Sequence, residues 1–372
     1  MSMMDEINTL PLLDMLCLIM VYFKILTYFC IEKYAPTLFK TVILRLKFRF
    51  FFLQIEHTFA LKHLYLCADY HSWIVGNPGD FKLADESVLD GGVLLAGGST
   101  DQDEAYRWFL TRARGGDVIV IRDGKEENYD DYPNNDAYNK YFYSDLGVQV
   151  DSVETIFLNS RTVADSSEVA RKIRQAEAIF FTGGDQWYYY KYIDNTRFQD
   201  ALDYAIEVKK VVVGGTSAGC AIQGEFVFTA EVDSIITSEA LADPYDAKLT
   251  IGRNLLRHTI LKNTITDTHY NERGRQGRHI AFMARVLKDS LDYNFSIVRG
   301  IGVDEQTVVC IESSGLARVF GNRDAYFLQQ NSQQEAMVES GILCTLTKED
   351  ILAIWHRNKK INWVNRQLNY FT

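Results

Sequence analysis

The chain has 372 residues, of which 47% are hydrophobic and 24% charged, a composition typical of globular proteins that bury a substantial core. Its formal net charge of −10 argues against a nucleic-acid partner. The six cysteines include no Cys-x-x-Cys pair, the seven histidines lack ligand spacing, and no phosphate-binding loop is present, so we expect neither a metal nor a cofactor.

Residues 1–66 differ in character from the rest of the chain. They carry seven basic and five acidic side chains and contain two apolar runs, 15–31 and 42–53. Lys24 interrupts the first run and would cost about 2.5–3.5 kcal/mol inside a membrane. Neither run has the pattern of a secretory signal peptide. Three interpretations stay open: a signal anchor, an extension outside the working domain, or an extra helical layer. The compartment, cytoplasmic or secreted, stays open with them.

Regular alternation of short apolar segments and amphipathic segments follows a turn cluster at residues 76–79. The apolar segments predict buried strands at 92–98, 118–121, 153–158, 178–181 and 211–213. The amphipathic segments predict helices at 101–114, 167–176 and 197–209. Because the strands lack a two-residue polar alternation, we expect an α/β fold with a mostly parallel sheet covered by helices on both faces.

The second half of the chain predicts further strands at 264–270 and 300–305, with a helix between them that begins near three arginines. Segments 307–311, 317–320 and 325–328 predict a C-terminal antiparallel meander. We therefore expect three parts: the extension 1–66, an α/β domain 67–330 and a C-terminal extension 331–372.

A G-x-S-x-G pattern occupies residues 215–219, directly after the predicted strand 211–213. This pattern is typical of a nucleophile elbow, in which a tight turn lifts Ser217 above the sheet and next to backbone N–H groups at a helix start. The alternative is an ordinary turn between a strand and a helix.

A serine nucleophile needs a base, and the base needs an orienting acid. Four histidines follow the elbow, and His269 alone is predicted at a strand end, where parallel sheets assemble their sites. A structural histidine is the alternative. Asp267, Asp304 and Glu305 are the candidate acids. On an extended strand Asp267 would share a face with His269, but spacing alone does not choose among the three.

Four motifs, in this order along the chain, resemble the cyanophycinase and dipeptidase E group of serine peptidases. They are FTGGDQ (181–186), GTSAG (215–219), DTHY (267–270) with the arginines that follow it, and GIGVDE (300–305). The resemblance extends from about residue 76 to residue 321. It implies a sheet similar to that of class I glutamine amidotransferases and a triad of Ser217, His269 and Glu305.

The same resemblance implies roles for further residues. Backbone N–H groups of Gly183, Gly184 and Ala218 would form the oxyanion hole. The implied substrate contacts are Gln186, Asp185, Asp267, Arg273, Arg275 and Arg278. The three arginines suit a substrate carboxylate, while structural ion pairs with acidic residues are the alternative for each.

The implied activity is that of a serine exopeptidase acting on a peptide substrate at aspartyl or β-aspartyl bonds. Cyanophycinases cut a β-aspartyl-arginine polymer, and dipeptidase E removes N-terminal aspartate. The chain departs from cyanophycinases at Thr268, where they usually have glutamine, and this affects substrate recognition more than catalysis. An esterase or amidase with the same triad, and an inactive binding protein, are the alternatives. A homodimer is compatible with the sequence.

Overall fold

The computed structural model describes residues 70–83, 89–124, 137–289 and 297–329, together with the backbone of residues 354–355 and 360–362. The predictions about residues 1–66, and about most of the polar segment 123–136, lie outside these residues. None of the described helices is long and apolar enough to span a membrane. The predicted limits of the α/β domain, 67–330, stay a prediction.

A large mixed sheet forms the centre of the fold. In the described part of the chain its strand order is β1-β4-β3-β5-β6-β2-β11-β12-β15. The five strands from β4 to β2 are parallel to their neighbours, as predicted, and the flanking pairs are antiparallel. The parallel strands are β4 (Ser152–Leu158), β3 (Asp117–Asp123), β5 (Ala178–Phe181), β6 (Val212–Thr216) and β2 (Val93–Ala96). The antiparallel strands are β1 (Ser72–Gly76), β11 (Thr307–Ile311), β12 (Leu316–Gly321) and β15 (Lys360–Asn362).

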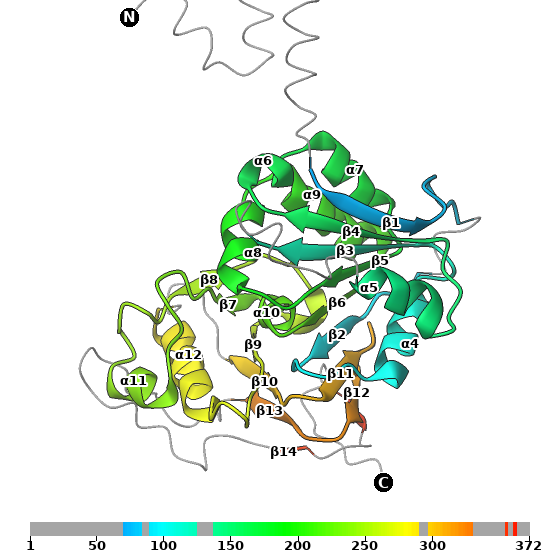
Figure 1. Cartoon of the computed structure of the whole chain (residues 1–372). Coiled ribbons are helices and arrows are strands. Elements are labelled where there is room, and N and C mark those ends of the chain that lie inside the picture. Colours follow the sequence, from blue (N-terminus) through cyan, green and yellow to red (C-terminus); the bar gives the residue numbers. More distant parts are fainter. Residues whose placement is uncertain are drawn as a thin grey trace, which may run out of the picture. The chain divides into compact units, whose positions relative to one another are not determined.

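Helices cover both faces of this sheet, which explains why its strands lack a polar alternation (Figure 1). Ile119 and Ile121 of β3 point toward one helical layer, and Val118 and Val120 point toward the other. The first layer comprises α6 (Arg161–Ala164), α7 (Ser167–Gln175), α8 (Gln186–Ile193) and α9 (Arg197–Asp203), which continues into the π-helix η4 (Tyr204–Lys209). The second comprises α4 (Asp103–Arg112), α5 (Ala137–Lys140) and the π-helix η3 (Tyr141–Asp145).

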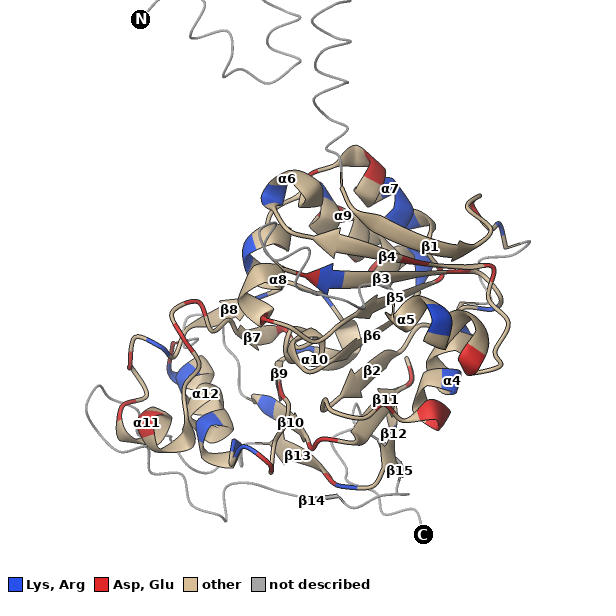
Figure 2. Ribbon diagram, viewed as in Figure 1, with Lys and Arg blue, Asp and Glu red and all other residues tan. Residues whose placement is uncertain are grey.

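Local sequence signals account for where these helices begin. The side chain of Ser166 accepts a hydrogen bond from Val169 N at the start of α7, and Asp185 accepts one from Trp187 N at the start of α8. Each satisfies a backbone donor that has no partner within its helix. Strands β2, β5 and β6 carry no charged residue, whereas helices such as α4 and α7 do (Figure 2).

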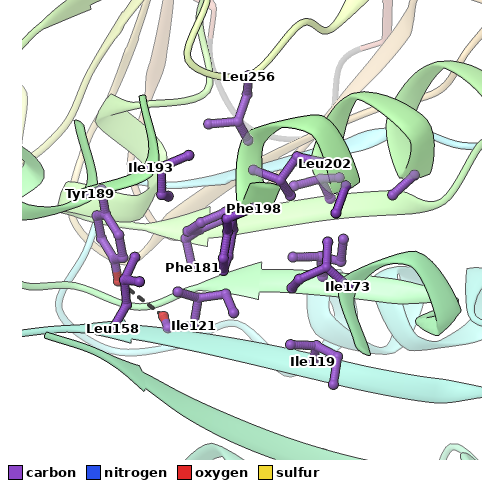
Figure 3. Packing of buried hydrophobic residues seen from close by; sticks show 14 of the residues in the cluster. Ile119, Ile121, Leu158, Ile173, Phe181, Tyr189, Ile193, Phe198, Leu202 and Leu256 are labelled. Carbon is purple, nitrogen blue, oxygen red and sulfur yellow. Dashed lines mark hydrogen bonds between the residues drawn. The ribbon is translucent and has the colours of Figure 1, made fainter. Parts of the chain in front are cut away.

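The core between the sheet and the first helical layer is the larger of the two. Phe181 of β5 and Phe198 of α9 lie at its centre, among aliphatic side chains from β3, β4 and α7 (Figure 3). Both phenylalanine side chains are fully buried. Packing in this core sets the distance of α8 and α9 from the sheet. It therefore also sets the position of the turn between β5 and α8.

Replacing Phe198 with alanine should lower the free energy of unfolding by about 3–5 kcal/mol, because it removes a buried ring from a packed core. Chemical denaturation monitored by circular dichroism would measure the change. Val208, 66% exposed on η4, is the control, and its alanine variant should stay within about 0.5 kcal/mol of the wild type. Equal effects of the two substitutions would contradict the packing described here.

A second, smaller sheet has the order β14-β13-β10-β9-β7-β8 among the described residues. Its middle strands β7, β9 and β10 are parallel, and the outer pairs are antiparallel. Its strands are β7 (Phe226–Phe228), β8 (Ile251–Arg253), β9 (Thr264–Asp267), β10 (Arg299–Val303), β13 (Ala325–Gln329) and β14 (Ile354–Trp355). The associated helices are α11 (Thr237–Ala242), the 3-10 turn η5 (Thr259–Leu261) and α12 (Gln276–Asp289).

The predicted C-terminal strands form and pair antiparallel, but they are divided between the two sheets. β11 and β12 extend the large sheet, whereas β13 pairs with β10 in the small one. The apolar segments identify each strand but do not identify its partners, because some partners come from distant parts of the chain. Two backbone segments of the tail, β14 and β15, pair with β13 and β12.

Candidate active site

The two sheets pack against each other through an apolar cluster that includes Leu95 of β2 and Ile301 of β10, and the segment after β2, with its pair of glycines, adds hydrogen bonds between them. Ala96 O accepts a hydrogen bond from Ser217 N (3.0 Å), and Gly97 O accepts one from His269 N (2.9 Å). Gly98 O accepts a third, from Gln306 N (3.0 Å). This short segment therefore joins the carboxyl end of β6 in the large sheet to the loops that follow β9 and β10 in the small sheet.

Ser217 lies in a tight turn between β6 and α10 (Ala218–Ala221), with φ +51° and ψ −115°. Two glycines make the turn fit. A Cβ on Gly215 would lie 2.2 Å from Gly219 O, and a Cβ on Gly219 would lie 2.2 Å from Phe181 O. Side chains at these two positions are therefore excluded, as expected for a nucleophile elbow. The predicted helix is present, but it is only four residues long.

The structure brings Ser217, His269 and Glu305 together. Ser217 Oγ lies 2.7 Å from His269 Nε2, and His269 Nδ1 lies 2.7 Å from Glu305 Oε1. A carboxylate only accepts hydrogen bonds, so it favours the tautomer in which Nδ1–H donates to Glu305. Nε2 then has a free lone pair that accepts the hydrogen bond from the Ser217 hydroxyl.

The other two candidate acids face elsewhere. Asp304 accepts hydrogen bonds from Asn271 N (2.9 Å) and Asp324 N (3.2 Å). Asp267 lies in the interior and binds arginine. The expected shared face of Asp267 and His269 is wrong, because β9 ends at Asp267 and His269 has φ +45°, outside extended geometry.

Burial lowers the pKa of His269 below its ordinary value, and the nearby positive charges of Arg273 and Arg275 add to this effect. The hydrogen bond from His269 to Glu305 acts in the opposite direction and does not cancel it. The imidazole is therefore neutral at neutral pH, which is the form that can accept a proton.

We therefore expect kcat/KM to fall on the acidic side, with an apparent pKa below 6.5, because protonation removes the base. Arg273→Gln should move this acidic limb toward higher pH, since it removes a positive charge near the imidazole. A pH–rate profile measures both effects. Arg171→Gln, on α7, is the control for a lost surface charge, and an identical shift in both variants would argue against the local effect.

Gly183 lies against the serine. A Cβ at Gly183 would be 3.3 Å from Ser217 Cβ and 3.8 Å from Ser217 Oγ. The preceding Thr182 O accepts a hydrogen bond from Gly219 N (3.1 Å), which fixes the turn after β5 to the elbow. Ala218 begins α10, where a backbone N–H has no acceptor within the helix. Gly183 and Ala218 therefore border Ser217, with Gly184 one residue further along.

The remaining predicted substrate contacts differ in their exposure to solvent. Asp185 is exposed and caps α8, while Gln186 Nε2 lies 3.5 Å from Phe228 O of β7. Arg273 is exposed in the turn that follows His269, and its backbone N–H donates to His269 O (3.1 Å). Asp185, Gln186 and Arg273 are the polar side chains of this set that solvent reaches most easily.

Arg278 and Asp267 belong to the interior, which favours the structural alternative over substrate contact. Arg278 is 2% exposed and donates to both oxygens of Asp267, at 2.7 and 2.9 Å. Its guanidinium lies against the rings of Phe228 and Phe282, which are stacked on each other. Because of this ion pair, the pKa of Asp267 stays below its ordinary value even though burial alone would raise it.

Arg275 occupies an intermediate position. Its Nη1 donates to Thr268 O (2.9 Å) and lies 3.3 Å from Thr268 Oγ1. Burial lowers the pKa of Arg275 to about 10. Thr268, the position that departs from the cyanophycinase pattern, is itself buried, so in this chain it contacts Arg275 rather than solvent.

Two features of the site were not predicted from the sequence. Gly98 (φ +103°) lies against the imidazole, where a Cβ would come within 2.4 Å of His269 Cε1. Glu272 Oε2 accepts a hydrogen bond from Glu305 N (3.1 Å), and Glu272 also pairs with Arg323. The glycine pair at the end of a buried strand was the only sequence signal for the first feature, and none pointed to the second.

In the residues that the structure describes, no three His, Cys, Asp or Glu side chains come together as metal ligands would. His258 and His279 are instead buried in separate hydrogen-bonded positions, against Gln223 and Tyr270. Burial lowers the pKa of His258 to about 3 and that of His279 to about 4. Both are therefore neutral structural histidines.

The family model of peptidase family S51 matches residues 94–319, which include all four motifs and the three side chains linked by hydrogen bonds. The chain belongs to peptidase family S51. The resemblance inferred from the four motifs is thereby confirmed, and the mostly parallel, helix-covered sheet agrees with it.

Relatives of this S51 chain include cyanophycinases. That of Synechococcus elongatus is 27% identical over 237 residues, which make up 62% of this chain and 65% of the relative. That of Geminocystis herdmanii is 25% identical over 243 residues, or 63% of this chain and 79% of the relative. The match thus spans 65% of the length of the first of these relatives. A solved peptidase from an acI-B1 Actinobacterium is 17% identical, with a TM-score of 0.48 and coverage of 73% of this chain and 97% of that one.

Proposed function

We propose that this S51 protein is a serine exopeptidase that hydrolyses aspartyl or β-aspartyl peptide bonds. The observation that carries the proposal is the unbroken hydrogen-bonded chain from Ser217 through His269 to Glu305, with 2.7 Å at each step. The serine is partly exposed at the carboxyl edge of the sheet, where a substrate can approach it.

In the proposed reaction, Ser217 Oγ attacks the carbonyl carbon while His269 Nε2 takes the hydroxyl proton. His269 then gives this proton to the leaving amine as the C–N bond breaks, and an acyl-enzyme remains. A water molecule repeats the sequence: it gives a proton to His269 and attacks the acyl carbon, and Ser217 recovers the proton as it leaves. Glu305 accepts the hydrogen bond from Nδ1–H and stabilises the imidazolium in each half-reaction.

The negative oxygen of the tetrahedral intermediate needs hydrogen-bond donors. The backbone N–H of Ala218 and those of the Gly183–Gly184 turn are the proposed donors, because the first follows the nucleophile directly and the second group borders it. Backbone donors of this kind hold their positions before the reaction, so little reorganisation accompanies the formation of the charge.

Positive charge near His269 supports an acidic substrate. Arg273 is exposed, and Arg275 is close enough for both to lower the pKa of His269. A guanidinium recognises a carboxylate strongly, and an aspartyl residue supplies one next to the scissile bond. The relatives named above are cyanophycinases, which agrees with a substrate that contains aspartate.

A substrate panel tests the proposal. The purified full chain would be assayed with β-aspartyl-arginine, an α-aspartyl dipeptide, the matching asparaginyl dipeptide and a simple acyl ester. We expect hydrolysis of an aspartyl bond, a lower kcat/KM for the asparaginyl analogue, and no activity in the Ser217→Ala protein. Preference for the ester would favour the esterase alternative, and the absence of serine-dependent turnover of any substrate would contradict the proposal.

A further inference from the structure

Asp123 is a buried carboxylic acid beneath the turn that borders Ser217. It ends strand β3, and its side chain is directed at the segment that connects β5 to α8. Asp123 Oδ2 accepts a hydrogen bond from Asp185 N (2.8 Å). Its Oδ1 lies so close to Gly184 that a Cβ there would be only 1.9 Å away. The carboxyl group therefore supports the turn from below.

The supported turn is the same one that contacts the nucleophile. Gly183 borders Ser217, Gly184 rests on Asp123, and Asp185 hydrogen-bonds to it, so three consecutive residues connect the carboxyl group to the serine. A second hydrogen bond, from Thr182 N to Ile121 O (2.9 Å), holds the start of the turn to β3. A change in the position of the Asp123 carboxyl would therefore move backbone N–H groups next to Ser217.

The surroundings of Asp123 disfavour its ionised form. The residue is 4% exposed, and Oδ1 is buried without a hydrogen-bond partner among the described residues. A buried anionic oxygen without a donor is much more costly than the neutral acid. The ionisable groups that act on Asp123 are Asp185 on the turn, which raises its pKa further, and Tyr189 on α8, whose hydroxyl acts in the opposite direction without cancelling the effect of burial.

We propose that Asp123 is a positioning residue, whose neutral carboxyl group holds the Gly183–Gly184 turn in its working geometry and whose ionisation impairs turnover. The inference rests on the function proposed above. Two effects follow from ionisation. The unpartnered charged oxygen forces the turn to rearrange, and a negative charge beneath the turn opposes the negative charge that develops on the substrate oxygen. Burial raises the pKa of Asp123 to about 7, so ionisation occurs in an accessible pH range.

The decisive experiment compares pH–rate profiles of the full chain and two variants with an aspartyl dipeptide as substrate. The wild-type kcat should decline on the alkaline side, by about tenfold per pH unit once Asp123 is ionised. Asp123→Asn, which keeps the neutral form at every pH, should lose this decline. Asp117→Asn is the matched control: Asp117 is also buried and also accepts a backbone N–H, from Phe81, but it lies at the opposite end of β3. Its profile should keep the wild-type shape.

A second variant separates support of the turn from charge. Asp123→Ala leaves Asp185 N without its acceptor and leaves Gly184 unsupported, so its kcat should lie about 100-fold below the wild-type maximum, with a smaller change in KM. Because alanine does not ionise, this variant should also lack the alkaline decline. An alkaline decline that persists in Asp123→Asn, or full activity of Asp123→Ala, would overturn the inference. The same assay tests the proposed function through hydrolysis by the wild type that is lost in Ser217→Ala. Failure of the proposed function and failure of the inference about Asp123 are therefore distinguishable.

Thermal unfolding gives a readout that needs no substrate. An acid whose pKa rises from 3.8 to about 7 on folding loses its contribution to stability as the pH rises through this interval. The melting temperature of the wild type should therefore fall relative to that of Asp123→Asn between about pH 4 and about pH 7, and then level off. Parallel pH dependences of the two proteins would overturn the inference whatever the substrate assays show.

Discussion

Replacing Ser217 with alanine should lower kcat by about four to six orders of magnitude, because the group that attacks the substrate is lost while the rest of the site stays in place. His269 would keep its hydrogen bond to Glu305, and the elbow would keep its shape, since the two glycines that permit it are unchanged. KM should change little. The measurement is steady-state kinetics on the best aspartyl substrate.

Ser314→Ala serves as the control for this large effect. Ser314 is exposed in the turn between β11 and β12, and its Oγ accepts a hydrogen bond from Leu316 N. Its loss should leave kcat within about twofold of the wild type, in line with surface substitutions in general. A Ser217→Ala protein that retained its peptidase rate would remove the serine from the mechanism.

Glu305→Gln should lower kcat by about three to four orders of magnitude. The amide has nearly the shape of the carboxylate but no charge, and its NH2 group can donate to His269 Nδ1. His269 would then carry its proton on Nε2, toward Ser217, in the tautomer that cannot accept the hydroxyl proton. Rates with wild-type and variant protein at saturating substrate measure the loss.

Asp304→Asn is the closest control, because Asp304 precedes Glu305 in the chain and differs in what it binds. Its carboxylate accepts two backbone N–H groups rather than a histidine. Its variant should lose some stability and at most about tenfold in kcat. If Asp304→Asn proved the more damaging of the two, the orienting acid would have to be reassigned.

Short-range patterns were sufficient for the strands, the helices and the elbow. Buried apolar segments between amphipathic ones indicate a parallel sheet, and G-x-S-x-G indicates a tight turn whose glycines exclude side chains, both of which the structure contains. These features depend on neighbours within a few residues of one another. The sequence therefore predicts Ser217 and the approximate place of His269 without any knowledge of long-range packing.

Features that depend on loop conformation or on long-range packing could not be predicted from the sequence. His269 leaves strand geometry at φ +45°, so counting residues from Asp267 gives the wrong face. Arg278 lies against the stacked rings of Phe228 and Phe282, which come from β7 and α12. Gly98 leaves space for the imidazole ring of His269, and its carbonyl oxygen accepts a hydrogen bond from Gln306 N. Because neither role involves a side chain, no pattern of side chains indicates it. The division of the last strands between the two sheets could not be predicted either, because β11 pairs with β2, from a distant part of the chain, and β13 pairs with β10 rather than with β12.

The nucleophile comes from one sheet and its base and acid from the other, with Gly97 and Gly98 hydrogen-bonded across the boundary. Slight slippage of the small sheet against the large one would separate the hydroxyl from the imidazole while leaving both sheets intact. Low concentrations of denaturant should therefore abolish hydrolysis before the secondary structure unfolds. The rate of hydrolysis is then a sensitive measure of the packing between the two sheets.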